Sequence, residues 1–341
     1  MKSNFLVLIA FCLSSQLVSQ PKDMFISKLT AINATSYTDV IFAGIKDTVL
    51  VSTFSGRIGM RINGVSKEKV IANVHDEIYS LAYHPKRKEI VASTLENGIL
   101  LIKFETGAIL KKLPLKTTWS INVFYSDNYQ YLITHDQKGN RYIWDVKNDY
   151  KEIAISNTVP PGRIVKMDDA GWMTIVTPNK LVVWDFHKST LLTSRDVQLV
   201  RFGDMDKDGH LLSVDFNECA KFNTGLKQNE FVVRHPNRLR DIRDFPNYQR
   251  SLQQSPSDFT KDGLFIDEGY SMQLTMVRFA KNYIYTASID RSIRQWNKET
   301  GALLSSLTGH RATVNKIRIN TTETQMVSID LKGGIRFWAI D

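Results

Sequence analysis

The stretch GDMDKDGHLLSVD, residues 203–215, combines the residue types and the spacing that a cation-binding loop needs. Alternating carboxylates followed by a tight glycine turn can surround a hard cation with oxygen ligands, as Ca²⁺ prefers. The alternative is that this stretch is an ordinary acidic hairpin turn between two strands. In that case it binds no calcium, and we expect the protein to require no cofactor. The predicted calcium ligands are Asp204, Asp206, Asp208 and, at the twelfth position of the loop, Asp215.

A second candidate site is the segment 235–263, HPNRLRDIRDFPNYQRSLQQSPSDFTKDG. It has three Pro, few β-branched residues and no alternating run long enough for three strands. Arginine and aromatic side chains are favoured at interface hot spots, because they combine forked donors with flat apolar area. A solvated loop, in which nearby Asp and Glu offset the cations, is the alternative. The predicted partner-binding residues are Arg238, Arg240, Arg243, Phe245, Tyr248 and Arg250.

The other chemistry-bearing residues form no recognised catalytic or zinc motif. The seven histidines show no H-x-x-x-H spacing, and no G-x-S-x-G, P-loop or G-x-G-x-x-G sequence occurs. Residues from distant segments can still converge on one site, so a hydrolase or lyase is kept as an alternative. The net charge is +9, but the basic residues are scattered without a polybasic run, so nucleic-acid binding is not expected.

The N-terminus has the pattern of a secretory signal peptide. Lys2 precedes nine apolar residues, Phe5–Leu13, and a cleavage pattern follows at Leu17–Ser19. Nine apolar residues cannot cross a bilayer core of about 30 Å, which requires about 20. We therefore expect residues 1–19 to be removed, no membrane span, and export to the periplasm or the extracellular space. Cleavage before Gln20 resembles that of secreted bacterial proteins, and a buried N-terminal strand is the alternative.

The elements that must position these residues are repeated along the chain. The C-terminal segment GGIRFWAID resembles RSIRQWNKETG, NRYIWDVKND and KLVVWDFHKST, with weaker relatives elsewhere. The large residues of these segments are separated by 42, 40, 40, 38, 74 and 42 positions. Five of the six spacings lie near 40, which is the period of a four-stranded propeller blade. The equivalent large residues are Ile62, Phe104, Trp144, Trp184, Phe222, Trp296 and Trp338.

These repeats resemble the WD-repeat family, and the resemblance covers about residues 25–341. The last copy, from Gly309 to Trp338, is nearest to the family pattern. In that family a His, a Ser or Thr, an Asp and a Trp form a buried hydrogen-bonded chain, which provides partners for an indole N–H and a carboxylate. In the last copy the resemblance implies this structural role for His310, Ser328, Asp330 and Trp338. In the copy before it, the corresponding residues are Ser288, Asp290 and Trp296, and Gly269–Tyr270 takes the place of Gly-His. In an earlier copy they are Thr134, Asp136 and Trp144.

By this resemblance the fold class is all-β, a seven-bladed β-propeller, with eight blades as the alternative. The spacing of 74 holds either two blades or one blade with an insertion, and the composition of the extra stretch favours the insertion. We expect one propeller domain over residues 24–341, with the insertion at about 235–270 on the top face near the channel mouth. The strand Met24–Ile32 is expected to pair beside Gly333–Ile340, which closes the ring and removes both open edges.

The function expected from this fold is a non-catalytic scaffold that binds a protein or another ligand outside the cytoplasm. A propeller hydrolase or lyase with its active site at the channel mouth is one alternative. An intracellular WD-repeat scaffold, whose N-terminus is not cleaved, is the other. We expect a monomer with a protein partner.

Overall fold

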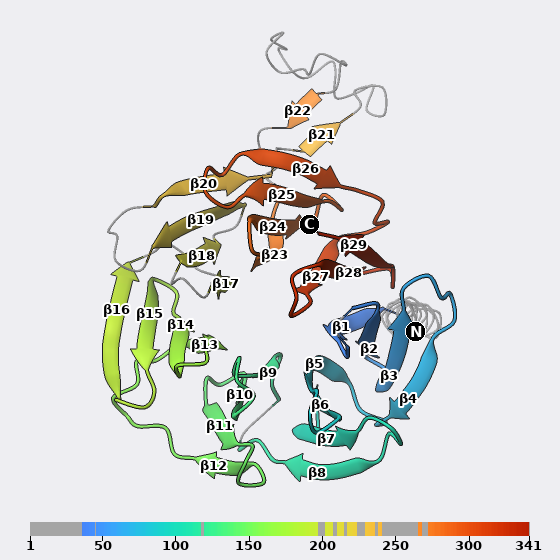
Figure 1. Cartoon of the computed structure of the whole chain (residues 1–341), viewed down its shortest axis with the longest axis vertical. Coiled ribbons are helices and arrows are strands. Elements are labelled where there is room, and N and C mark those ends of the chain that lie inside the picture. The colour runs from blue at the N-terminus through green and yellow to red at the C-terminus, as the bar shows by residue number, and fades with distance from the viewer. Residues whose placement is uncertain are drawn as a thin grey trace, which may run out of the picture.

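A ring of antiparallel sheets surrounds a central axis, as Figure 1 shows. The structure is a computed structural model that describes residues 36–44, 46–116, 119–196, 202–206, 210–214, 217–223, 229–235, 238–240, 265–267 and 272–340. The predicted signal peptide and the predicted closing strand Met24–Ile32 lie outside the described residues. Within the described part of the chain, no helix is long and apolar enough to cross a membrane.

Six blades each consist of four consecutive strands, which run from the axis outwards as an antiparallel meander. Blade 1 contains β1 (Tyr37–Phe42), β2 (Thr48–Thr53), β3 (Arg57–Ile62) and β4 (Lys69–Asn73). Blade 2 contains β5 (Ile78–His84), β6 (Glu89–Thr94), β7 (Ile99–Lys103) and β8 (Ile109–Leu113). Blade 3 contains β9 (Val123–Tyr125), β10 (Tyr131–His135), β11 (Arg141–Asp145) and β12 (Lys151–Ile153). Blade 4 contains β13 (Arg163–Met167), β14 (Trp172–Val176), β15 (Lys180–Asp185) and β16 (Thr190–Asp196). Blade 5 contains β17 (Phe202–Met205), β18 (His210–Val214), β19 (Glu218–Asn223) and β20 (Phe231–Arg234). Blade 6 contains β23 (Leu274–Phe279), β24 (Tyr283–Ser288), β25 (Ile293–Asn297) and β26 (Leu303–Leu307).

Two further sheets are smaller than a blade. The terminal sheet has three strands, β27 (Val314–Ile319), β28 (Gln325–Asp330) and β29 (Ile335–Ala339), and a two-stranded ribbon pairs β21 (Arg238–Arg240) with β22 (Phe265–Asp267). The β-propeller is confirmed, but the prediction of seven blades, with eight as the alternative, is wrong, because the described residues form six four-stranded blades. The repeat period locates one large residue in each copy and does not show whether that copy supplies four strands.

The strand sequences reflect burial on both faces of each sheet. Strand β6 is buried at every position, and β15 is buried everywhere except at Lys180. The outermost strand of the same blade, β16, has no buried residue. Sheets that are covered on both faces read as continuous apolar runs rather than as strict alternation, and the middle strands follow that rule.

The hydrophobic core is divided among the interfaces between neighbouring sheets, and these interfaces continue around the whole ring. The terminal sheet packs on both of its neighbours. Met326 lies in a cluster with Tyr285 of blade 6, and Val327 lies in a cluster with Val40 of blade 1. Successive residues of a strand point to opposite faces, so one strand supplies both interfaces.

Polar contacts also join the terminal sheet to the first two blades. The Asp39 carboxylate accepts a hydrogen bond from Ser80 Oγ at 2.9 Å and pairs with Arg318 at 3.1 Å. Ser36 Oγ donates to the Leu331 carbonyl at 2.6 Å. The two ends of the described ring are therefore in direct contact through packing, hydrogen bonds and an ion pair.

Candidate functional site

A buried hydrogen-bonded chain joins the loop before the terminal sheet to its last two strands. Trp338 Nε1 donates to Ser328 Oγ at 2.7 Å, and this hydroxyl lies 2.6 Å from His310 Nε2. His310 Nδ1 lies 2.9 Å from Asp330 Oδ2, and three backbone N–H groups also donate to the Asp330 carboxylate. Burial raises the pKa of Asp330, but these hydrogen bonds outweigh burial and hold the pKa below its usual value. The four residues thus lie together in an arrangement that stabilises the sheet.

Blade 6 contains the same chain with two members that the sequence analysis did not identify. His235 Nδ1 lies 2.8 Å from Asp290, His235 Nε2 lies 2.7 Å from Thr286 Oγ1, and Trp296 Nε1 donates to that hydroxyl at 2.8 Å. The residues expected in these places were Gly269–Tyr270, outside the described residues, and Ser288.

Spacing explains why Thr286, and not Ser288, is the hydroxyl residue, and the insertion explains why His235 was not predicted. The hydroxyl residue precedes the tryptophan by 10 positions in both sheets, and this interval identifies Thr286 from the sequence. The histidine precedes the aspartate by 20 positions in the terminal sheet but by 55 in blade 6. No local pattern connects His235 to its partners, because the insertion separates them.

In blade 3 the equivalent aspartate has a different partner. Asp136 accepts hydrogen bonds from the N–H groups of Lys138 and Asn140 in the turn after β10, and from the Tyr142 hydroxyl at 3.1 Å. Trp144 stacks on the Tyr142 ring, with the ring centroids 5.6 Å apart. Tyr142 therefore donates to this aspartate where a histidine contacts it in the other two sheets, but the Thr134 hydroxyl lies 2.5 Å from Ser120 Oγ and the chain does not continue in the same way.

The β21–β22 ribbon marks the two ends of the predicted partner-binding segment. Leu239 pairs with Ile266, and Arg238 and Arg240 belong to the same strand. Figure 1 shows the ribbon outside the ring, beyond the outer strand β26, and not over the central opening. The expected position at the channel mouth is therefore not the one that these two strands adopt. The other predicted binding residues, Arg243, Phe245, Tyr248 and Arg250, lie outside the described residues.

Asp204 and Asp206 of the acidic loop make contacts with different residues. Asp204 Oδ2 accepts a hydrogen bond from the Phe279 N–H of the next blade at 2.9 Å. Asp206 accepts from the His210 N–H at 2.8 Å and pairs with Lys298 Nζ at 2.6 Å. Asp208 and Asp215 lie outside the described residues.

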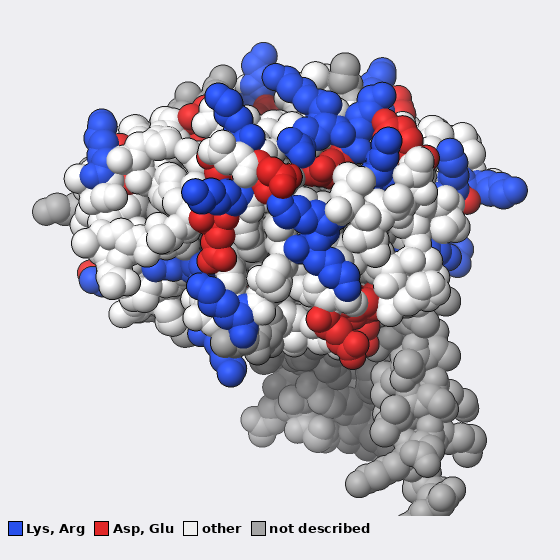
Figure 2. All heavy atoms as spheres, turned by 90° about the horizontal axis from the view of Figure 1, so that it is seen from below, with Lys and Arg blue, Asp and Glu red and all other residues white. Residues whose placement is uncertain are grey.

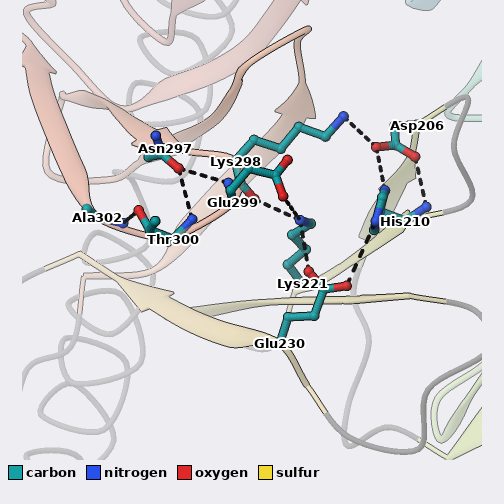
Figure 3. Close-up of polar contacts among 9 residues, drawn as sticks. All are labelled: Asp206, His210, Lys221, Glu230, Asn297, Lys298, Glu299, Thr300 and Ala302. Atoms are coloured by element: carbon teal, nitrogen blue, oxygen red, sulfur yellow. Dashed lines mark hydrogen bonds and ion pairs between the residues drawn. The ribbon is translucent and has the colours of Figure 1, made fainter.

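Asp206 belongs to an ionic cluster that joins the loops at one end of blades 5 and 6, shown in Figure 3. Lys221 has no exposed surface, and its Nζ lies 2.8 Å from Glu230 Oε2 and donates to the Lys298 carbonyl at 2.8 Å. Each lysine of the cluster has a carboxylate partner, Glu230 for Lys221 and Asp206 for Lys298. Its members are Asp206, His210, Lys221, Glu230, Lys298 and Glu299.

The Asp206 ion pair bears directly on the calcium hypothesis. Burial raises the pKa of Asp206, but the hydrogen bonds from Lys298 and from the His210 backbone outweigh it and lower the pKa. A calcium ion at this carboxylate has to displace the Lys298 ammonium. Among the described residues, no group of three His, Cys, Asp or Glu side chains is placed to hold a metal ion. With two of the four predicted ligands undescribed, the calcium site stays a prediction.

Comparison with known proteins supports the fold rather than a particular activity. A family described as SdiA-regulated matches residues 61–161. Among the curated proteins, none matches this sequence. The WD40 β-propeller domain of Doa1 superposes with a TM-score of 0.65 at 10% identity, covering 91% of this chain and 94% of that one. U3-55K superposes with a TM-score of 0.66 at 12% identity, covering 90% of this chain and 92% of that one. By its fold, therefore, this chain is a repeat-built β-propeller of the kind seen in WD40 domains.

Proposed function

We propose that this protein is a non-catalytic scaffold that binds a protein partner outside the cytoplasm. The observation that carries the proposal is the ribbon of β21 and β22. Strand β16 ends at Asp196 and β17 begins at Phe202, whereas β20 ends at Arg234 and β23 begins only at Leu274. Long insertions in compact domains are commonly functional, and the β21–β22 ribbon of this one lies outside the ring, beyond β26.

The charge distribution favours a protein partner over a nucleic acid. Figure 2 shows Lys and Arg side chains interleaved with Asp and Glu on the side of the ring that lies lowest in Figure 1. On the rim formed by blades 2 and 3, Lys111 pairs with Asp149 at 2.8 Å and Lys116 pairs with Glu152 at 3.4 Å. Nucleic-acid binding requires cations that are free to neutralise phosphates, and these lysines already have carboxylate partners.

Replacement of residues 241–264 by a short Gly-Ser linker tests the scaffold. The variant keeps both strands of the ribbon, and we expect an unchanged melting temperature because shortening a loop changes its closure entropy only logarithmically. We expect partners recovered by pull-down from the native host to be lost. An Arg238→Ala/Arg240→Ala variant tests the ribbon alone, and Lys103→Ala on β7 is the control. Retention of every partner by the linker variant would refute binding through this segment.

The proposed location is tested separately by the intact mass of the protein from its native host. Removal of the predicted signal peptide leaves residues 20–341. A mass equal to the full 341 residues would favour the intracellular scaffold instead.

A further inference from the structure

Three cations lie on the adjacent inner strands of blade 6 and the terminal sheet. Arg278 belongs to β23, and Lys316 and Arg318 belong to β27; all three side chains are half-buried. Residues two apart in a strand share a face, so Lys316 and Arg318 point the same way. Burial is the main cause that lowers the pKa of Lys316; Asp39 opposes it, and Arg318 and Arg278 lower the pKa further by smaller amounts.

The nearest carboxylate is fully occupied. Asp39 has no exposed surface, and its two oxygens accept hydrogen bonds from four different groups. A carboxylate has room for about four such bonds, so Asp39 has no further capacity for Lys316. Its donors are Val40 N, Ser80 Oγ, Leu81 N and Arg318 Nη2.

Most of the donors of Lys316 and Arg278 have no acceptor among the residues that the structure describes. Within the described residues, Lys316 makes no hydrogen bond and no ion pair, while Arg278 donates only to the Val277 carbonyl, at 2.9 Å. Asp204, the other carboxylate that acts on Arg278, accepts its hydrogen bond from the Phe279 backbone. Like charges at close range with few partners are unfavourable unless a counter-charge joins them.

The inner strands as a set have the same excess of positive charge. Across β1, β5, β9, β13, β17, β23 and β27 they carry five Lys or Arg residues and two Asp residues, a difference of 5 − 2 = +3. Figure 1 shows that these are the strands nearest the axis. The five cations are Arg163, Lys166, Arg278, Lys316 and Arg318, and the two anions are Asp39 and Asp204.

We propose that Lys316 and Arg278 bind a small oxyanion, a carboxylate or a phosphate, near the axis between β23 and β27. The planar guanidinium matches the oxygens of such a group, and the ammonium supplies a second charge. Arg318, fixed by its ion pair with Asp39, adds to the positive potential without being released from its partner. This site does not depend on the scaffold role proposed above.

Binding of inorganic phosphate and of citrate to the full chain tests the proposal and distinguishes the two sources. We expect one of them to raise the melting temperature and to give a calorimetric isotherm at constant ionic strength, whereas chloride does neither. Lys316→Met keeps the apolar stem and should weaken binding at least tenfold. Lys332→Met, at an exposed position in the turn after β28, is the matched control and should bind as the parent does.

The melting temperature of Lys316→Met in the absence of phosphate and citrate provides a second readout. Because Lys316→Met relieves repulsion from two cations, its melting temperature in chloride should equal or exceed that of the parent. If that variant does not fold, Lys316→Arg keeps the charge and should retain binding. The proposal is overturned if the parent binds neither anion at millimolar concentration, or if Lys316→Met binds as tightly as the parent.

Discussion

Buried polar residues with several fixed partners stabilise individual sheets, and Asp330 is one of them. Its side chain is 2% exposed and accepts hydrogen bonds from His310 and from three backbone N–H groups. Asp330→Ala leaves these donors unsatisfied, so we expect a loss of about 1–3 kcal/mol in the free energy of unfolding. Lys332→Ala, at an exposed position, should change it by less than about 0.5 kcal/mol. Equal losses in denaturant titrations would contradict a structural role for the chain.

His135 makes stability depend on pH. The side chain is 6% exposed, and neither ring nitrogen has a hydrogen-bond partner. Burial and the nearby Arg163 lower the pKa of His135 to about 4, against the opposite effect of Asp136. Between pH 6.5 and pH 4 the unfolded chain binds a proton that the folded protein does not, so acidification destabilises the fold.

The expected loss from His135 is about 2 kcal/mol between pH 6.5 and pH 5. Unfolding free energies measured at these two pH values should differ less in His135→Gln than in the parent. His187→Gln, at an exposed position in the turn after β15, should retain the dependence of the parent. A parent whose stability is constant over this range would refute the prediction.

At the scale of elements, the ionic cluster fixes the loops of blades 5 and 6 against each other. The Lys298 side chain is 8% exposed and Asp206 is 7% exposed, so removal of one partner leaves a buried charge. Lys298→Met should therefore lower the free energy of unfolding by about 3 kcal/mol. Lys88→Met should have little effect, because Lys88 is 64% exposed and its partner Glu105 is 43% exposed.

Melting curves in millimolar Ca²⁺ and in chelator separate this cluster from a calcium site. If Asp206 acts through Lys298 alone, the loss in Lys298→Met is the same in both conditions. A parent protein that melts higher in Ca²⁺ would support the predicted site, since ligand bound only to the folded state stabilises it by mass action.

At the scale of the whole molecule, the ring depends on the contact between its first blade and the terminal sheet. Asp39 joins β1 to β5 and to β27. Asp39→Ala removes the partner of the Arg318 charge, and we expect a loss of about 3–5 kcal/mol. Hydrogen exchange should increase in blades 1 and 2 and in the terminal sheet together, whereas Asp196→Ala, 89% exposed, should leave exchange unchanged. Faster exchange confined to β1 would show that the ring does not respond as a unit.

The sequence alone determined the repeat and therefore the propeller. A large residue recurs near every fortieth position because most copies bury it between two neighbouring sheets, as they do Trp144, Trp184, Phe222 and Trp296, although Ile62 is 37% exposed. His310, Ser328, Asp330 and Trp338 could be found for the same reason, since they lie within one copy and their spacing is set by one hairpin and the loop before it.

Tertiary structure alone decided the contacts between copies. Lys221 reaches the Lys298 carbonyl across 77 positions, and His235 reaches Asp290 across 55, so no local pattern contains either pair. The spacing of the acidic loop indicated oxygen ligands for a cation, but the cation beside Asp206 in the described residues is a lysine from the next blade. The number of four-stranded blades was also decided by the tertiary structure. The sequence period shows how many copies of the repeat the chain has, whereas backbone pairing determines how many strands each sheet contains.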